Sequence, residues 1–141
     1  MTHLDMVAEF HRAFGHPIRP VPGADVSEKA LRMNLIQEEV DELASALGLE
    51  WDGDSGTWYD IGASVNTVEV ADALADIDYV VQGAALVFGI PHDAVFDEVH
   101  RSNMAKLVDG KVIRREDGKI LKPEGWTPPD VLGVLLGSLD R

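Results

Sequence analysis

The sequence predicts an all-α fold, a bundle of four to five helices with a small C-terminal β-hairpin. Long segments in which apolar residues recur at helical spacing alternate with segments rich in glycine and proline. The chain has 141 residues, of which 45% are hydrophobic, and this is enough for one domain with its own core. We therefore expect residues 1–141 to form a single domain.

The composition argues against several classes of protein, namely nucleic-acid-binding, membrane-spanning and disulfide-containing proteins. The formal net charge is −13, and a surface of this sign repels nucleic acid, so we expect no nucleic-acid polymer as a partner. No segment approaches the roughly 18 apolar residues that span a membrane, and the N-terminus lacks the pattern of a secretory signal. The absence of cysteine excludes disulfides and thiolate metal sites. These features favour a cytoplasmic protein with no membrane partner.

The N-terminal part contains two predicted helices. The first covers residues 3–14 and leads into a proline-rich loop over residues 15–26. Asp25 or Ser27 can cap the second helix, which runs to about Leu47.

Two further helices are predicted after a loop. Residues 48–64 are rich in glycine, aspartate and serine, and we expect them to be irregular. Asn66 or Thr67 can cap a third helix that ends at Gly89. Pro91 suits the first position of a fourth helix.

The C-terminal part has a different pattern. Asp109-Gly110 and Asp117-Gly118 are turn dipeptides, each followed by a short run that includes apolar residues, which predicts a small hairpin. A last short helix is expected from Asp130 to Leu139.

Three glutamates of the second helix form the first candidate site. At about 100° per residue, Glu38, Glu39 and Glu42 fall within one arc of about 100°, and Leu31 and Leu35 project in the same direction. A solvated acidic face would not continue into leucines, so we expect this face to point inward, although the glutamates alone also fit an ordinary solvated face. Enclosed carboxylates repel each other unless cations compensate, and oxygen ligands suit Mg²⁺ or Mn²⁺.

The third helix carries a second set of acids. Glu69, Asp72 and Asp76 lie within about 60° of each other on the helical wheel, whereas Asp78 and Gln82 are expected to face solvent. Asp76 and Asp72 are candidate metal ligands, and Glu69 is expected to interact with the helix dipole. Two helices with inward carboxylates predict one divalent-metal site between them.

The basic residues are concentrated late in the chain. Asn103 and Lys106 lie on the apolar stripe of the fourth helix, where they need partners such as a phosphate, unless Lys106 extends to water. Arg115, Lys119 and Lys122 follow in the predicted hairpin and are candidate substrate ligands or solvated charges.

The order of these motifs, Glu38-Glu39-x-x-Glu42, then Asp76, then Asn103-x-x-Lys106, resembles the MazG-like all-α nucleoside triphosphate pyrophosphohydrolases. The resemblance covers nearly the whole chain and is closest to short single-domain members related to dimeric dUTPases and phosphoribosyl-ATP pyrophosphohydrolases. It implies that a nucleoside triphosphate, dUTP-like or another, is hydrolysed between the α- and β-phosphates to a monophosphate and pyrophosphate. It also implies Mg²⁺ (or Mn²⁺) held by the three glutamates and Asp76.

The chain departs from the family pattern at one position. The second acidic motif of the family is Glu-x-x-Asp, and Ala73 stands where the glutamate would precede Asp76. Asp72 is a possible substitute, because acids four residues apart share a helix face. The number of metal ions therefore stays open, as does the choice of Glu38 or Glu39 as the catalytic base.

The resemblance also bears on partners and on rival functions. It leads us to expect that Tyr79 and Asn103 contact the base or sugar. The apolar second and third helices predict oligomerisation through helices, as a homodimer or higher homo-oligomer. One alternative is a non-catalytic nucleotide-sensing or dimerisation module of the same fold. A di-iron protein would need paired Glu-x-x-His motifs, and only Asp97-x-x-His100 occurs, once.

Overall fold

The computed structural model describes residues 1–140 and contains five helices and one two-stranded sheet. In chain order these are α1 (His3–Phe14), α2 (Lys29–Leu47), β1 (Leu49–Asp52), β2 (Thr57–Asp60), α3 (Thr67–Phe88), α4 (His92–Met104) and α5 (Val131–Ser138).

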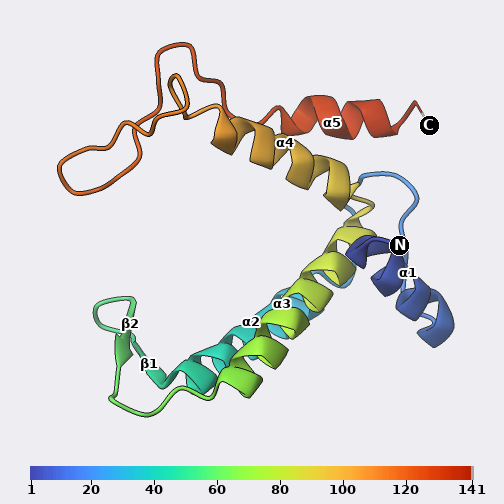
Figure 1. Cartoon of the computed structure of the whole chain (residues 1–141). Coiled ribbons are helices and arrows are strands. Elements are labelled where there is room, and N and C mark those ends of the chain that lie inside the picture. The colour runs from blue at the N-terminus through green and yellow to red at the C-terminus, as the bar shows by residue number, and fades with distance from the viewer. Residues whose placement is uncertain (141) are drawn as a thin grey trace.

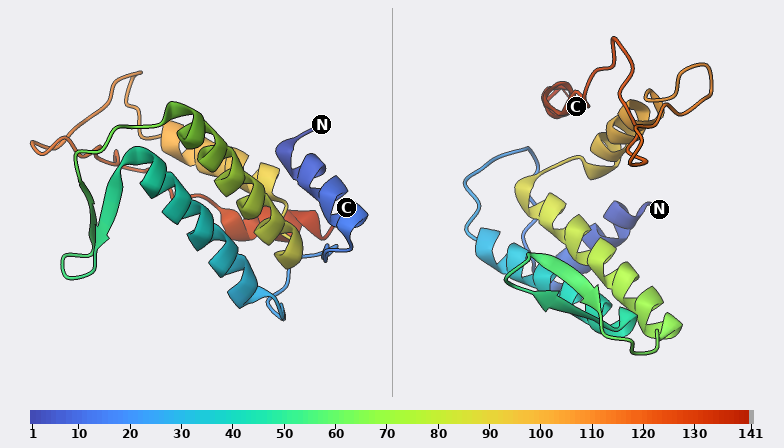
Figure 2. Two further views of the ribbon diagram at one scale, coloured as in Figure 1. Left: turned by 90° about the horizontal axis from the view of Figure 1, so that it is seen from below. Right: turned by 90° about the vertical axis from the view of Figure 1, so that its left-hand side faces the viewer.

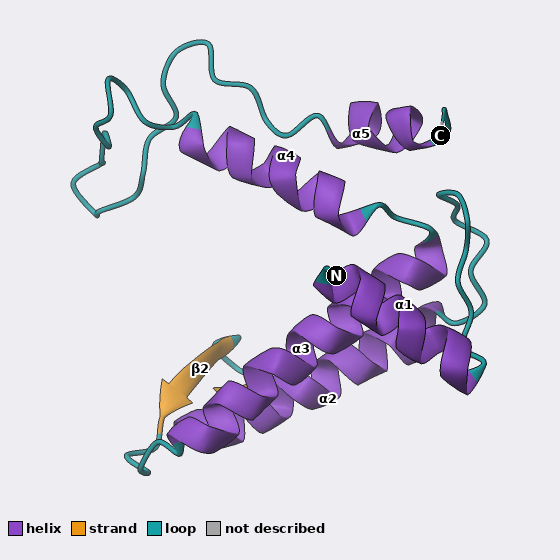
Figure 3. Cartoon of the chain, turned by 45° about the vertical axis from the view of Figure 1, so that its right-hand side comes forward, coloured by secondary structure: helices purple, strands orange, loops and turns teal. Residues whose placement is uncertain are grey.

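The helices form two groups rather than one bundle. Helices α2 and α3 lie side by side, and α1 packs against α3 (Figure 1). Helix α4 packs on α5, and this pair projects away from the first group (Figure 3). The helical class and the number of helices expected from the sequence are confirmed. The single four-to-five-helix bundle is not formed within one chain.

Local sequence explains where the helices begin. Asn66 caps α3 as expected, because its side-chain oxygen accepts a hydrogen bond of 3.2 Å from the Glu69 backbone. Helix α2 begins later than expected, with Glu28 at the N-cap position. Neither Asp25 nor Ser27 caps it, and no side chain of the described residues takes that role.

The regular β-hairpin lies at residues 49–60, within the segment that was expected to be a loop. Its register pairs Leu49 with Asp60 and Trp51 with Trp58, and the two indole rings lie 5.1 Å apart. Aromatic and β-branched residues favour such cross-strand pairs. The prediction of an irregular loop here was wrong because the four glycines lie in the turn and at the two ends of the hairpin, and the strands themselves contain none.

The expected C-terminal hairpin is present only in fragments. Residues 108–121 contain two isolated bridges, Val108 with Lys111 and Arg114 with Ile120, and no regular strand was found among residues 105–130. The Asp-Gly turns form, but the apolar runs beside them are too short to extend a ladder.

The core lies where α1 crosses the C-terminal half of α3. Val7, Ala8 and Leu86 are buried there, with Leu4 and Ile18 packed against them. The loop that follows α1 is held against the end of α3 by backbone hydrogen bonds from residues 19 and 23 to residues 86 and 88. Gly89 permits this, because a Cβ there would lie 2.1 Å from the Val21 carbonyl oxygen.

The α4–α5 group is held together by a few specific contacts. The Ser102 side chain is fully buried and donates to the Thr127 carbonyl oxygen at 3.0 Å, while the Trp126 indole N–H donates to the Ser102 carbonyl oxygen at 2.7 Å. These bonds fix the segment between α4 and α5, which loops outward (Figure 2).

No single helix among residues 1–140 is long and apolar enough to cross a membrane. Helices α3 and α4 meet the length and composition requirement only when they are taken together, and the chain bends by 113° between them.

Candidate functional site

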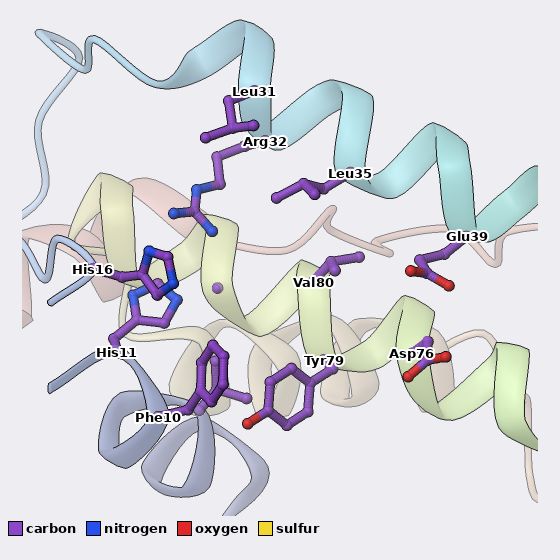
Figure 4. A pocket seen from close by; sticks show the side chains of 12 residues that line it. Phe10, His11, His16, Leu31, Arg32, Leu35, Glu39, Asp76, Tyr79 and Val80 are labelled. Carbon is purple, nitrogen blue, oxygen red and sulfur yellow. The ribbon is translucent and has the colours of Figure 1, made fainter. Parts of the chain in front are cut away.

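A cavity of about 400 Å³ lies between α1, α2 and α3 (Figure 4). Helix α2 contributes Leu31, Leu35 and Glu39 from successive turns, and α3 contributes Asp76 and residues one and two turns further on. Three residues of the face of α2 that was expected to point inward therefore line the cavity, whereas Glu38 and Glu42 of that face are exposed and do not line it. The cavity has carboxylates at one end and apolar walls in the middle.

The carboxylate end is formed by two helices. One carboxylate oxygen each from Glu39, Glu42 and Asp76 lies within 4.8 Å of the other two. None of these three acids forms a salt bridge with any residue of the described chain. Partial burial, together with the nearby Glu42 and Asp76 carboxylates, raises the pKa of Glu39 to about 7.

This arrangement fits a divalent cation. Glu39 Oε2 is buried and has no hydrogen-bond partner among residues 1–140, which is costly for a carboxylate oxygen unless a ligand satisfies it. Carboxylate oxygens are the ligands that Mg²⁺ and Mn²⁺ prefer. Glu39, Glu42 and Asp76 are therefore the residues that could hold such an ion.

Two other predicted ligands lie outside this cluster. Glu38 is exposed on α2, although its charge contributes to the raised pKa of Glu39. Asp72 is exposed and lines a neighbouring cavity of about 280 Å³ together with Glu42 and the buried Ala73. Glu42 thus belongs to the carboxylate cluster and also lines the neighbouring cavity, in which Asp72 lies.

The predicted substrate-binding residues are divided between the two helix groups. Tyr79 lines the main cavity and packs edge to face on Phe10, with ring centres 5.5 Å apart. Asn103 and Lys106 lie in and after α4, outside the cavity lining, and hydrogen bond to each other at 3.0 Å.

The basic residues after α4 are engaged locally. Arg115 pairs with Asp117, whose carboxylate also accepts from the Lys119 backbone at 3.1 Å. The ammonium of Lys122 lies 4.7 Å from the centre of the Trp126 ring. None of these three basic residues lines the main cavity of the described chain. Their contact with a substrate stays a prediction.

Sequence reasoning missed two polar residues at the inner end of the cavity. Arg32 is 6% exposed and donates to Glu28 at 2.9 Å, and His11 is 2% exposed and shares a hydrogen bond of 2.9 Å with the Pro17 carbonyl oxygen. The four-residue spacing of Glu28 and Arg32 is the one sequence feature that could have indicated this pair. Asp78 and Gln82, expected in solvent, hydrogen bond to each other at 3.0 Å, and Gln82 is buried.

Together these features form a cavity with carboxylates at its mouth and a polar inner end, separated by apolar walls. Such a cavity can hold a flat aromatic group such as a nucleobase between its apolar walls, while phosphates attached to it meet cations at the carboxylates.

Comparisons with known proteins agree with this description. An uncharacterized protein of Acanthamoeba polyphaga mimivirus is 36% identical to this chain over 97 residues. The match covers 65% of this chain and 33% of the viral protein, so it spans a minor part of that relative's length. The model of the phosphoribosyl-ATP pyrophosphohydrolase family matches residues 7–103, which include α1 to α4 almost completely and every residue of the carboxylate cluster. The chain belongs to the phosphoribosyl-ATP pyrophosphohydrolase family, whose members are pyrophosphohydrolases that act on phosphoanhydride bonds.

Proposed function

We propose that this protein hydrolyses a nucleoside triphosphate between the α- and β-phosphates, in a reaction that requires a divalent cation. The observation that carries the proposal is the group of Glu39, Glu42 and Asp76, two of which line the cavity, with no basic residue of the described chain paired to it. Family membership supports the reaction class, and the cavity of about 400 Å³ supports a substrate of nucleoside size.

The cation is proposed to be Mg²⁺, with Mn²⁺ as a substitute, and Glu39, Glu42 and Asp76 would hold it. When bound, it would neutralise charge on the phosphate oxygens and position them for in-line attack. Asp72, across Glu42, is proposed as a contributor of lesser effect.

The chain's own carboxylates would also handle the proton. The attacking water must lose a proton, and Glu38 and Glu39 are adjacent to the place where the phosphates would lie. Glu38 is exposed and outside the three-acid cluster, so it is free to take that proton while Glu39 stays a ligand. We therefore favour Glu38 as the base. In a variant that lacks the Glu38 carboxylate, the adjacent Glu39 would take the proton instead.

The apolar walls set the orientation of the substrate. Leu35 and Val80 lie between the carboxylates and the inner end, and Leu31 lies beside Arg32 (Figure 4). A triphosphate would not be stable among them, because a charged group loses its hydration there. The base would therefore enter the cavity, beside Tyr79, and the phosphates would stay at the mouth.

A product assay tests this proposal. The purified protein is incubated with the eight common ribo- and deoxyribonucleoside triphosphates and Mg²⁺ or Mn²⁺, and the products are identified by phosphorus NMR. We expect a nucleoside monophosphate and pyrophosphate, and no reaction when the metal is chelated. Release of inorganic phosphate would reject cleavage between the α- and β-phosphates, and no turnover of any nucleotide would favour the non-catalytic module of the same fold.

We also propose that the protein is a homodimer or a higher homo-oligomer that assembles through its helices. Phe96 on α4 and Leu132 on α5 are 65% and 67% exposed, and Leu74 on α3 is 53% exposed. Apolar surface of this extent on both helix groups is unusual for a monomer. Sedimentation equilibrium at micromolar concentration should give a multiple of 15.4 kDa, and a folded species at the monomer mass would reject the proposal.

A further inference from the structure

Acidic and basic residues occupy different parts of this chain. Residues 33–100 contain 15 acidic residues and no lysine or arginine, whereas residues 105–122 contain six basic and three acidic residues. Residues 105–122, here called the basic arm, follow α4 and loop outward from it (Figure 2). No salt bridge among residues 1–140 joins the basic arm to residues 33–100. The positive charge of the arm is therefore not paired with the acidic region of the same chain.

The β1–β2 hairpin is an acidic surface with exposed aromatic rings. Trp51, Trp58 and Tyr59 are 54%, 38% and 46% exposed. Four acids lie among these rings, and none of them forms a salt bridge with a described residue: Glu50, Asp52, Asp54 and Asp60. The sheet has only two strands and stands beyond the end of α2 (Figure 1), and such a hairpin is marginally stable in water on its own. A partner that covers the rings and carries positive charge would stabilise it.

The basic arm has the complementary pattern of residues. Each of the runs 111–114 and 119–122 has a basic residue at both ends and two apolar residues between them. The four apolar side chains are 39% to 44% exposed. Lysine and arginine pair with carboxylates and also lie favourably on aromatic rings, as Lys122 does at 4.7 Å from the centre of the Trp126 ring. The arm therefore offers both kinds of group that the hairpin lacks.

The net charge of the chain restricts how two copies can meet. At −13, two copies repel each other over most of their surface, so association is favoured by a contact between opposite charges. Residues 1–32 contain equal numbers of basic and acidic residues, and residues 123–141 contain more acidic than basic ones. The arm is thus the segment of the chain that can supply the positive side of such a contact.

We propose that the basic arm of one copy docks on the β1–β2 hairpin of a second copy. A two-fold dimer makes this contact twice, because each copy has one arm and one hairpin. Within one chain the arm follows α4 and the hairpin follows α2, and a second copy brings its arm to the hairpin without any change in the bend of 113° between α3 and α4. This inference rests on the proposed homo-oligomer and assigns a surface to it.

Charge reversal on either surface should weaken self-association. Glu50→Lys with Asp54→Lys reverses the hairpin, and Lys111→Glu with Lys119→Glu reverses the arm. We expect each double variant to self-associate at least about tenfold more weakly than the wild type in sedimentation equilibrium, with an unchanged circular dichroism spectrum. Raising NaCl from about 50 mM to about 500 mM should also weaken the wild type, because salt screens exposed charges.

Matched controls separate this contact from the effect of net charge. Glu9→Lys with Asp97→Lys, and Arg12→Glu with Lys29→Glu, change the net charge by the same amounts at exposed positions outside the arm and the hairpin. Asp97 is also next to the exposed ring of Phe96, so the first control tests an acid beside an aromatic ring elsewhere. Each control should self-associate more tightly than the double variant that has the same net charge.

An equimolar mixture of the two double variants tests whether the contact lies between chains. In a mixed dimer the acidic arm of one variant meets the basic hairpin of the other, and the unchanged arm meets the unchanged hairpin. Both contacts then join opposite charges, so association should recover in the mixture. A fluorescent label on one variant follows the mixed dimer in sedimentation velocity.

Cross-linking of the wild type gives a second measurement that does not depend on any variant. Unlabelled and ¹⁵N-labelled chains are mixed and treated with a carbodiimide, which joins a lysine directly to a carboxylate. We expect cross-linked peptides in which an arm lysine of one isotope is joined to a hairpin acid of the other. If such peptides are absent, the inference is wrong even when a double variant fails to fold.

The outcomes separate this inference from the other proposals. A wild type that stays monomeric would overturn both the inference and the proposed oligomer. A dimer that is weakened no more by the double variants than by their controls, or a mixture that does not recover, would overturn the inference and leave the oligomer in place. Nucleotide turnover enters none of these measurements, so the proposed reaction is tested separately.

Discussion

The acids of the two helix groups have opposite surroundings. Glu39, between α2 and α3, faces two other carboxylates, and its pKa is raised to about 7. Glu98, between α4 and α5, accepts two hydrogen bonds of 2.8 Å from Arg101 and one of 2.9 Å from the Asp130 backbone, which lower its pKa to about 2. Glu98 has its partners within the chain, whereas no basic residue of the described chain pairs with Glu39.

The partners of an acidic residue distinguish a structural acid from a candidate metal ligand better than the number of acidic residues in the chain does. The chain has 25 acidic residues, and most are exposed or paired locally. A group of carboxylates that is partly enclosed, mutually repulsive and without a basic partner in the described residues is unfavourable for the fold alone. Such a group indicates a site for a cation.

The largest effect should come from neutralising the cluster. Glu39→Gln and Glu42→Gln are each expected to lower the turnover of the best nucleotide by about 10²–10³-fold, the scale for the loss of one electrostatic group in an active site. Glu98→Gln is the matched control and should stay close to the wild-type rate. Near-normal turnover in either cluster variant would show that these acids are not ligands.

A smaller effect on turnover is expected from substitution of the two aspartates of α3, Asp76 and Asp72. Asp76→Asn should raise the Mg²⁺ concentration for half-maximal turnover by at least about tenfold, and Asp72→Asn by less, because Asp72 lies in the neighbouring cavity. Equal effects would place Asp72 among the ligands, as the substitute for the glutamate that Ala73 replaces. In that case Ala73→Glu should not improve metal binding.

The smallest expected effect is the pH dependence that Glu39 gives to the free energy of unfolding when no metal is added. The unfolded chain releases the Glu39 proton near pH 4.5, while the folded chain holds it to about pH 7, so the folded chain binds more protons between these values. Raising the pH through this range should therefore lower the free energy of unfolding. Solvent screens the partly exposed side chain, so we expect a loss on the order of 1 kcal/mol.

Denaturant unfolding with EDTA, at about pH 5 and about pH 8, measures this loss. The glutamine of Glu39→Gln cannot titrate, so the free energy of unfolding of this variant should decrease less than that of the wild type. Other acids titrate in both proteins, so some decrease is expected in each. Parallel behaviour of the two proteins would mean that Glu39 is not repelled by its neighbours.

The carboxylate site could be predicted from the sequence because helical spacing fixes which side chains share a face. Leu31, Leu35 and Glu39 follow at intervals of four residues, and the structure places all three in one cavity. On α3, Asp76 meets these residues because α2 and α3 pack side by side, whereas Asp72, one turn earlier, lies in the neighbouring cavity.

The inner end of the cavity could not be predicted in the same way. Arginine is rarely buried, so Arg32 gave no reason to place it inside, and His11 is buried by a loop whose path depends on tertiary contacts. The hairpin at residues 49–60 was missed because glycine content outweighed the aromatic pair in the interpretation. The separation of α4 from α2 and α3 depends on a bend after Gly89, and the spacing of apolar residues in the sequence does not predict the direction or size of such a bend.

Direct titration of Mn²⁺ into the nucleotide-free protein, with free and bound ion distinguished by electron paramagnetic resonance, tests the central claim. The account predicts saturable binding in the wild type and in Glu98→Gln, and loss of that binding in Glu39→Gln and Glu42→Gln. The plateau also gives the number of ions per chain. Identical binding curves for the wild type and both cluster variants would contradict the claim that Glu39, Glu42 and Asp76 form the metal site.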